Sequence, residues 1–309
     1  MISRSAILGA LVVVELAIIG MAAQALCFSG PFGAAFAGSP AWASTGMTHP
    51  RLDRTFATGE QPHVVVDVHD VDVTVEAGSA PRVHVVETIH AAGLVTGRLD
   101  RAVAEQTPDG VRITSGAGGG RVVIGVFERS LRLTVPPGAR VDIESAGSVL
   151  ASGLRAKLIA HSDNGAIRVR DHRGDVDLET ANGRIELADV QGATIGATSH
   201  NGRLVFERIG ADRLDATTGN GRVVAHALRV VDGRISSGNG VVELALAPDS
   251  DSTVTAHSGN GRVRLHHLAP ADTDEDEDHA RVVRLGTGRG HFEVSTGNGS
   301  ITLTQGANV

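Results

Sequence analysis

The side chains best suited to bind a ligand are four arginines that share one position in a repeated motif. Arg184, Arg203, Arg222 and Arg262 each stand two residues after an asparagine that is followed by glycine, and Val241 takes this place in one repeat. If successive repeats stack as neighbouring strands, equivalent residues lie about 4.8 Å apart. A guanidinium group offers forked donors to carboxylate or phosphate. The spacing therefore predicts an outward stripe that could lie along a polyanion such as an acidic envelope glycan.

The same arginines have a second interpretation that requires no ligand. Outward acids such as Glu186 and Glu243 lie on the same or the next repeat, where they can pair with the arginines. Exposed ion pairs contribute only about 0–1 kcal/mol each. On this interpretation the stripe is a solvated edge that keeps the strands soluble.

Other reactive side chains lack the spacing that catalysis or metal binding needs. His161 and His257 share one outward repeat position, but four repeats lie between them, and His266 and His267 form at most an adventitious metal site. The acidic run at 272–278 lacks both the spaced acids and the turn glycine of a calcium loop, so we expect a solvated loop. No catalytic residue, metal or cofactor is expected.

The motif that would position the arginines is a repeat in the second half of the chain. Its Asn-Gly pairs recur at intervals of 18, 19, 19, 19, 21 and 38 residues, and the last interval, two periods long, predicts one coil that has lost its pair. The corner residues are Asn164, Gly165, Asn182, Gly183, Asn201, Gly202, Asn220, Gly221, Asn239, Gly240, Asn260, Gly261, Asn298 and Gly299.

Apolar and polar residues alternate on both sides of each Asn-Gly pair, as at Ile185 and Leu187, which predicts two short strands per repeat. Asn-Gly between alternating runs is also a hairpin signal. A meander gives no reason for a fixed period, however, whereas a solenoid of stacked coils does. Because Asn and Gly both tolerate a left-handed backbone, we expect them to form the same sharp corner in every coil.

A second column supports this register. Two residues before each asparagine the side chain is a hydroxyl, at Ser162, Thr180, Ser199, Thr218, Ser237, Ser258 and Thr296. By alternation it points inward, where it can bond a turn amide or a neighbour in the next coil. Seven equivalent hydroxyls argue against a nucleophile, which an active site needs once.

The S/T-x-N-G repeat, the stretch LTVPPGARVDIES at 133–145 and an apolar N-terminal segment together carry a family resemblance. The chain resembles a bacterial family described as β-strand-repeat, "putative adhesin" domains of unknown function, over roughly residues 64–303. The resemblance implies a single-stranded, right-handed β-helix, and it supplies no catalytic residues to transfer.

Residues 1–28 begin with MISR, and the run from Ala6 to Phe28 is apolar except for Glu15 and Gln24. A run of this length can span a bilayer of about 30 Å, whereas a cleaved signal peptide has an apolar core of about 7–15 residues. We therefore expect a transmembrane anchor, with a cleaved signal segment as the alternative. Arg4 before the segment would hold the N-terminus in the cytoplasm and place the remaining chain outside.

These observations predict an all-β fold, a right-handed parallel β-helix with ~19-residue coils preceded by an N-terminal transmembrane helix. We expect a flexible tether at 29–60, an irregular β part of the solenoid at 61–140, and the regular β-solenoid at 141–309. An acidic loop insertion is expected at 270–280.

Composition narrows the function. The net charge is −7 without a basic domain, so nucleic acid is not an expected partner. Aromatic residues are 3%, with no tyrosine, so the ring-stacking subsites typical of polysaccharide hydrolases and lyases are not expected. Outward acids such as Asp177, Asp215 and Glu293 are spread along the repeats, whereas an inverting hydrolase needs two converging carboxylates.

The expected function is therefore that of a membrane-anchored, extracytoplasmic β-solenoid of adhesin-like type, which binds a partner or acts as a scaffold in the cell envelope. An envelope glycan or a protein is the expected partner. One alternative is an envelope-stress regulator that binds a membrane partner, and a more distant one is a β-helix polysaccharide hydrolase or lyase.

Overall fold

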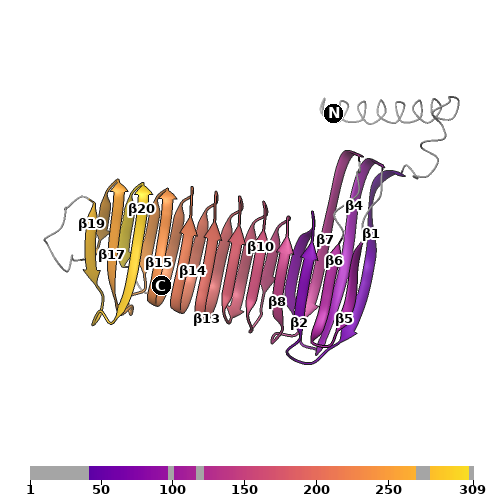
Figure 1. Cartoon of the computed structure of the whole chain (residues 1–309), viewed down its shortest axis with the longest axis horizontal. Coiled ribbons are helices and arrows are strands. Elements are labelled where there is room, and N and C mark those ends of the chain that lie inside the picture. Colours follow the sequence, from indigo (N-terminus) through magenta and orange to yellow (C-terminus); the bar gives the residue numbers. More distant parts are fainter. Residues whose placement is uncertain (1–41, 97–100, 116–121, 269–278, 306–309) are drawn as a thin grey trace, which may run out of the picture.

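The computed structural model describes residues 42–96, 101–115, 122–268 and 279–305, and in this part the chain is all-β (Figure 1). Strands at the N-terminal end are β1 (Trp42–Ala57), β2 (His63–Val68), β3 (Asp72–Ala77), β4 (Arg82–Thr96), β5 (Ala102–Thr107), β6 (Gly110–Ser115) and β7 (Val122–Val135). The expected anchor at 1–28 lies outside the described residues.

The strands of the central and C-terminal coils follow in order. They are β8 (Arg140–Ser145), β9 (Val149–Ser152), β10 (Leu158–Ser162), β11 (Ile167–Arg173), β12 (Val176–Thr180), β13 (Ile185–Ser199), β14 (Leu204–Thr218), β15 (Val223–Asn239), β16 (Val242–Leu246), β17 (Ser252–Asn260), β18 (Val263–His266), β19 (Ala280–Arg284), β20 (Gly290–Asn298) and β21 (Ile301–Gln305). In Figure 1 they form one elongated stack.

Neighbouring coils pair in parallel and in register, which confirms the solenoid over the hairpin alternative. Ile185 lies opposite Leu204 and Leu187 opposite Phe206, and Leu204 in turn lies opposite Val223. These side chains are buried, as alternation predicts. Each coil therefore has a first face, formed by the strand before the Asn-Gly corner, and a second face, formed by the strand after it.

The C-terminal coils do not stack in chain order. The last coil, β20–β21, lies between β15–β16 and β17–β18 and pairs in parallel with both. Gly233 on β15 stands opposite Phe292 on β20, and a Cβ at Gly233 would meet that ring at 2.8 Å. The missing side chain on one coil thus makes room for the large one on the inserted coil.

This order corrects the expectation that a coil has lost its Asn-Gly pair. The long interval between Asn260 and Asn298 is taken up by the segment that returns to the stack and by β19, which pairs antiparallel with β17. Residues 269–278 of the acidic insertion lie outside the described residues.

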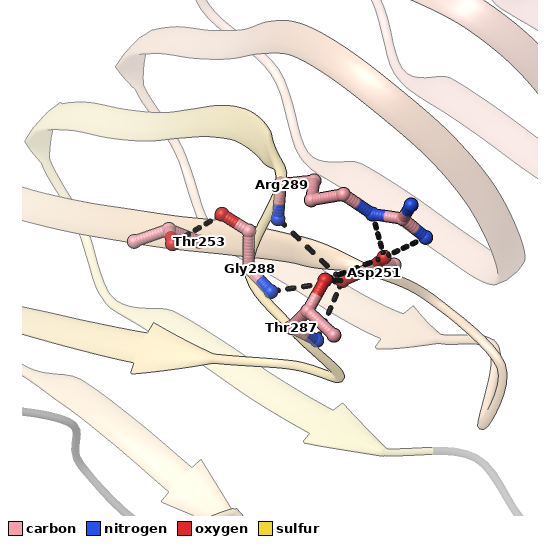
Figure 2. A network of polar contacts seen from close by, with 5 residues as sticks. All are labelled: Asp251, Thr253, Thr287, Gly288 and Arg289. Carbon is pink, nitrogen blue, oxygen red and sulfur yellow. Dashed lines mark hydrogen bonds and ion pairs between the residues drawn. The ribbon is translucent and has the colours of Figure 1, made fainter.

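A network of hydrogen bonds centred on Asp251 stabilises the turn just before β20, where the inserted coil begins (Figure 2). Asp251, between β16 and β17, accepts hydrogen bonds from the backbone N–H groups of Thr287 and Gly288 at 2.7 and 2.8 Å, and from Arg289 Nε at 2.7 Å. The Arg289 and Thr287 hydrogen bonds hold the pKa of the Asp251 carboxyl well below its usual range. Gly288, at φ 70°, also accepts a hydrogen bond from Thr253 through its carbonyl oxygen.

The N-terminal end shows the same exchange of order. The coil formed by β2 and β3 lies between β6–β7 and β8–β9, with parallel pairing on both sides. Part of the region expected to be irregular, 61–140, is therefore already a regular coil. Both ends of the described stack thus hold a coil that is inserted out of chain order.

Antiparallel strands extend the N-terminal end. β4 pairs antiparallel with β7 and with β1, and the three project beyond the stack as a ribbon (Figure 1). This corrects the tether expected at 29–60, because Trp42–Ala57 is a strand. The glycine and proline residues in this stretch interrupt the alternation of apolar and polar residues from which a strand is predicted. The stretch forms a strand because it pairs with β4.

A buried ion pair lies where the ribbon joins the stack. Glu87 Oε1 accepts hydrogen bonds from Arg129 Nη2 and Nε at 2.7 and 3.2 Å, and Glu87 Oε2 accepts one from the Ala102 N–H at 3.1 Å. The two side chains are 0% and 2% exposed. Since a buried charge is tolerated only when it is paired and hydrogen-bonded, this contact ties β4, β5 and β7 together.

Candidate functional site

The predicted arginine stripe lies on the outward side of the second face. Arg184, Arg203 and Arg222 directly precede the in-register strands β13, β14 and β15, and all three side chains are exposed. Arg262 is exposed too but stands apart. Because β20–β21 is inserted, two coils separate it from Arg222 instead of the single Val241 coil expected from the sequence.

Carboxylates on the same or the next coil already lie beside two of these arginines. Glu186 accepts hydrogen bonds from Arg184 Nη1 at 2.6 Å and from Arg168 Nε at 2.9 Å, and Arg222 lies 4.0 Å from Glu243. Burial alone would raise the pKa of Glu186, but the hydrogen bonds from the two arginines outweigh it and hold that pKa below its usual value. Within the described chain no carboxylate pairs with Arg203.

The corner asparagines form a ladder that fixes the spacing of the stripe. Six of the seven side-chain amides donate to the amide oxygen of the adjacent coil's asparagine, at distances of 2.6–3.0 Å. The order is Asn164, Asn182, Asn201, Asn220, Asn239, Asn298 and Asn260. The ladder thus follows stacking order and not chain order.

The hydroxyl column forms a second ladder, inside the corner. Ser162 Oγ accepts a hydrogen bond from the Gly165 N–H at 3.0 Å and donates to the Gly147 carbonyl oxygen at 2.8 Å in the adjacent coil. Thr180 repeats both contacts with Gly183 and Gly165. Both predicted partners, the turn amide and the next coil, are therefore used at once, which confirms a structural role for the column.

The corner glycines are needed for a different reason from the one expected. The described left-handed residues do not include the corner asparagines, so the corner is not a left-handed turn at those positions. A Cβ at Gly183 or Gly202 would instead overlap the carbonyl oxygen of the corner glycine below it. Close stacking of the coils, and not φ, requires glycine here.

A profile of one protein family matches residues 62–304, the full length of this stack; the family is described as Toastrack DUF4097. The chain belongs to the Toastrack family. This confirms the resemblance to a β-repeat family of unknown function. A search of curated proteins finds no match to the chain.

Two solved structures share this fold, and a third can be compared with them in length and identity. A "putative adhesin" from Parabacteroides distasonis is 13% identical, with a TM-score of 0.51 over 84% of this chain and 97% of that one. Another, from Parabacteroides merdae, is 11% identical, with a TM-score of 0.51 over 84% and 96%. One from Bacteroides fragilis is 10% identical, with a TM-score of 0.48 over 82% and 96%.

A second corner of the Toastrack coil was not recognised in the sequence. Seven residues after the corner asparagine the backbone is left-handed although the residue is not glycine, at Asp171, Asp189, Arg208, Ala227 and His267. Asp189 and Arg208 form an ion pair across adjacent coils, at 2.8 Å between Oδ2 and Nη2. The variety of side chains hides this corner, since its common feature is the backbone angle.

His172 was also missed. It occupies the inward position that Val190, Ile209 and Leu228 fill in the next three coils, and it is 1% exposed. Within the described residues, neither ring nitrogen makes a hydrogen bond of good geometry. Burial lowers the pKa of its ring. A neutral imidazole therefore replaces an aliphatic side chain in the core.

The remaining candidates stay apart. His161 lies between Glu144 and Glu179 on adjacent strands, far along the stack from His257 on β17. Over 42–96, 101–115, 122–268 and 279–305, no three His, Cys, Asp or Glu side chains are grouped to hold a metal ion. The same residues contain no helix with the length and apolar character of a membrane span.

Proposed function

We propose that this chain is a membrane-anchored, extracytoplasmic β-solenoid of adhesin-like type, with right-handed coils, that binds a polyanionic envelope glycan along its second face. The observation that carries the proposal is the set of three exposed arginines, Arg184, Arg203 and Arg222, at equivalent positions of three successive coils. The names of the structural neighbours agree with a binding role.

The stack gives these arginines a fixed spacing. Neighbouring strands lie about 4.8 Å apart, so the three positions span about 10 Å. The asparagine ladder beside them holds each coil in register with the next. The backbone of the stripe is therefore ordered before a polyanion binds, so binding does not have to order the chain.

The acids beside the stripe set the strength of the contact. Glu186 binds Arg184, and Glu243 lies near Arg222, so a polyanion must compete with them. Exposed ion pairs are weak, and exchange of one carboxylate for another is therefore inexpensive. Arg203, without such a partner in the described chain, is the position where the gain is largest.

Retention on an immobilised acidic polysaccharide at low salt tests the binding. The variant Arg184→Ser/Arg203→Ser/Arg222→Ser should be retained less strongly than wild type, and wild-type retention should fall as salt rises. Arg112→Ser/Arg155→Ser/Arg173→Ser removes the same charge from exposed arginines elsewhere and should be retained. Equal retention of both variants would reject the stripe as the binding surface.

Anchoring requires a separate experiment. The full-length chain should sediment with the membrane fraction, and its solenoid should be digested by protease added outside the cytoplasmic membrane. Deletion of residues 1–28 should release it. A deleted chain that still sediments with membranes would show that another segment holds it there.

A further inference from the structure

Two adjoining hollows lie on the outward side of the N-terminal sheet, where the ribbon meets the stack. One, of about 360 Å³, is lined by the turn between β3 and β4 together with Thr55, Arg82 and His84. The other, of about 480 Å³, is lined by residues of β3, β4 and β7, among them Arg132. Both share His84 and Thr134, so they form one groove, here called the junction groove.

The polar side chains of the junction groove are largely uncommitted. Arg82 and Arg132 are exposed, and no carboxylate in the described chain pairs with either. Six hydroxyls line the groove without a hydrogen bond to another described residue: Thr55, Thr74, Ser79, Thr88, Ser130 and Thr134. On the stripe, by contrast, two of the three arginines already have carboxylate neighbours.

The strand register sets the distance between the two arginines. Arg132 on β7 lies opposite Val86 on β4, four residues beyond Arg82 on the same strand. At about 3.4 Å per residue they stand about 14 Å apart along the strand. His84 and Thr134, which lie opposite each other, are between them. A ligand that reaches both arginines must therefore be longer than a single small anion.

Acidic residues around the groove leave its centre open. Asp53 binds His84 Nε2 at 2.9 Å and thereby holds that ring. Glu76 is paired with Thr134, and Asp72 with Ser130, on the neighbouring strand β3. Asp72 also accepts a hydrogen bond from the Ser148 N–H at 2.8 Å. These acids disfavour a densely charged polyanion and favour a ligand that carries few charges among many hydroxyls.

We propose that the junction groove binds a short segment of a carboxylated sugar chain, with carboxylates at Arg82 and Arg132 and sugar hydroxyls at the threonine and serine side chains between them. Arginine suits a carboxylate because its two parallel N–H groups match the two oxygens. Hydroxyl groups donate and accept in turn, which suits a polyol. The site is separate from the arginine stripe and does not require it.

The test is a calorimetric titration of the purified full-length chain with trigalacturonate. We expect saturable binding, weakened about tenfold or more in Arg82→Ser/Arg132→Ser, since hydrogen bonds to charged groups are lost. Arg132→Lys keeps the charge but loses the fork, so it should bind with intermediate affinity. Arg112→Ser, which changes an exposed arginine on β6, is the matched control and should bind as wild type.

Control ligands and the stripe variant distinguish binding at the junction groove from non-specific anion binding. Neutral maltotriose and inorganic phosphate should not saturate the site, and the triple stripe variant should still bind trigalacturonate. Equal binding of maltotriose would overturn carboxylate recognition, and equally tight phosphate binding would overturn recognition of a sugar. Absence of trigalacturonate binding, or unchanged binding in the double variant, would overturn the site itself.

Because both arginines are exposed, the melting temperature of each variant should equal that of wild type. If the double variant does not fold, the comparison is made with Arg82→Ser alone.

Discussion

Asn298 donates a hydrogen bond to Asn239 at 2.6 Å, although Asn260 is the next corner along the chain. Asn260 in turn donates to Asn298 at 2.8 Å. The last coil therefore separates two coils that precede it, and the outermost coil rests on residues made later in the chain. Such an arrangement protects the C-terminal coil from fraying, because its strands are paired on both sides.

Removal of the inserted coil should affect the coil beyond it. A chain that ends at residue 285 loses β20 and β21 and leaves β17 and β18 without the strands on which they stack. We expect a lower melting temperature and rapid proteolysis within 250–285. Wild-type protease resistance of this segment in the shortened chain would contradict the inserted order.

Asn298→Ala, which removes two ladder bonds but keeps the coil, should cost about 1 kcal/mol of unfolding free energy for each bond.

The corner glycines should be intolerant of a methyl group. Gly202→Ala would drive a Cβ into the Gly183 carbonyl oxygen, so we expect a loss of about 1–3 kcal/mol or more of unfolding free energy. Gly210→Ala is the control in the same coil, because its Cβ would meet only Gln191 Cγ at 3.6 Å. That substitution should be neutral or stabilising by about 0.4–1 kcal/mol. Urea unfolding measures both, and equal effects would show that coil spacing does not require glycine.

The ion pair at the foot of the ribbon should be sensitive to the loss of one partner. Arg129→Met leaves the Glu87 carboxylate buried without its charge partner, for an expected cost of about 3–5 kcal/mol. Glu87→Leu/Arg129→Met removes both charges and should cost much less than the two single changes summed. Urea midpoints of the four proteins form the cycle. Additive effects would indicate that the two side chains do not act as a unit.

His172 should make stability depend on pH. Since burial lowers its pKa in the folded state, the unfolded chain binds the proton more readily. Unfolding free energy should therefore be highest above about pH 6.5 and fall as pH falls below it. His172→Leu restores the aliphatic pattern of Val190 and Ile209 and should be more stable, with a larger advantage at pH 5 than at pH 7. An advantage that stays equal at both pH values would rule out protonation of this ring as the cause.

The sequence by itself determined the repeating unit. Alternation around each Asn-Gly pair places Leu204 and Phe206 inward, because the inward positions of stacked coils must be apolar. The constant spacing places Ser199 and Thr218 at the same corner of successive coils, because buried polar groups at the corner must be hydrogen-bonded. The outward position of Arg184, Arg203 and Arg222 follows from the same register. For these positions the information is local and repeated seven times.

Only the tertiary structure decided which coil lies beside which. The Asn-Gly units are nearly equivalent, so the corner that lies beside Asn239 could be that of Asn260 or that of Asn298, and no local pattern ranks the two. The match of Gly233 to Phe292 is a contact between residues far apart in the sequence. The junction groove arises in the same way, since Arg82 and Arg132 come to line one groove only when β4 pairs antiparallel with β7. Long-range pairing is set by the packing of whole strands, and a period of about 19 residues does not encode it.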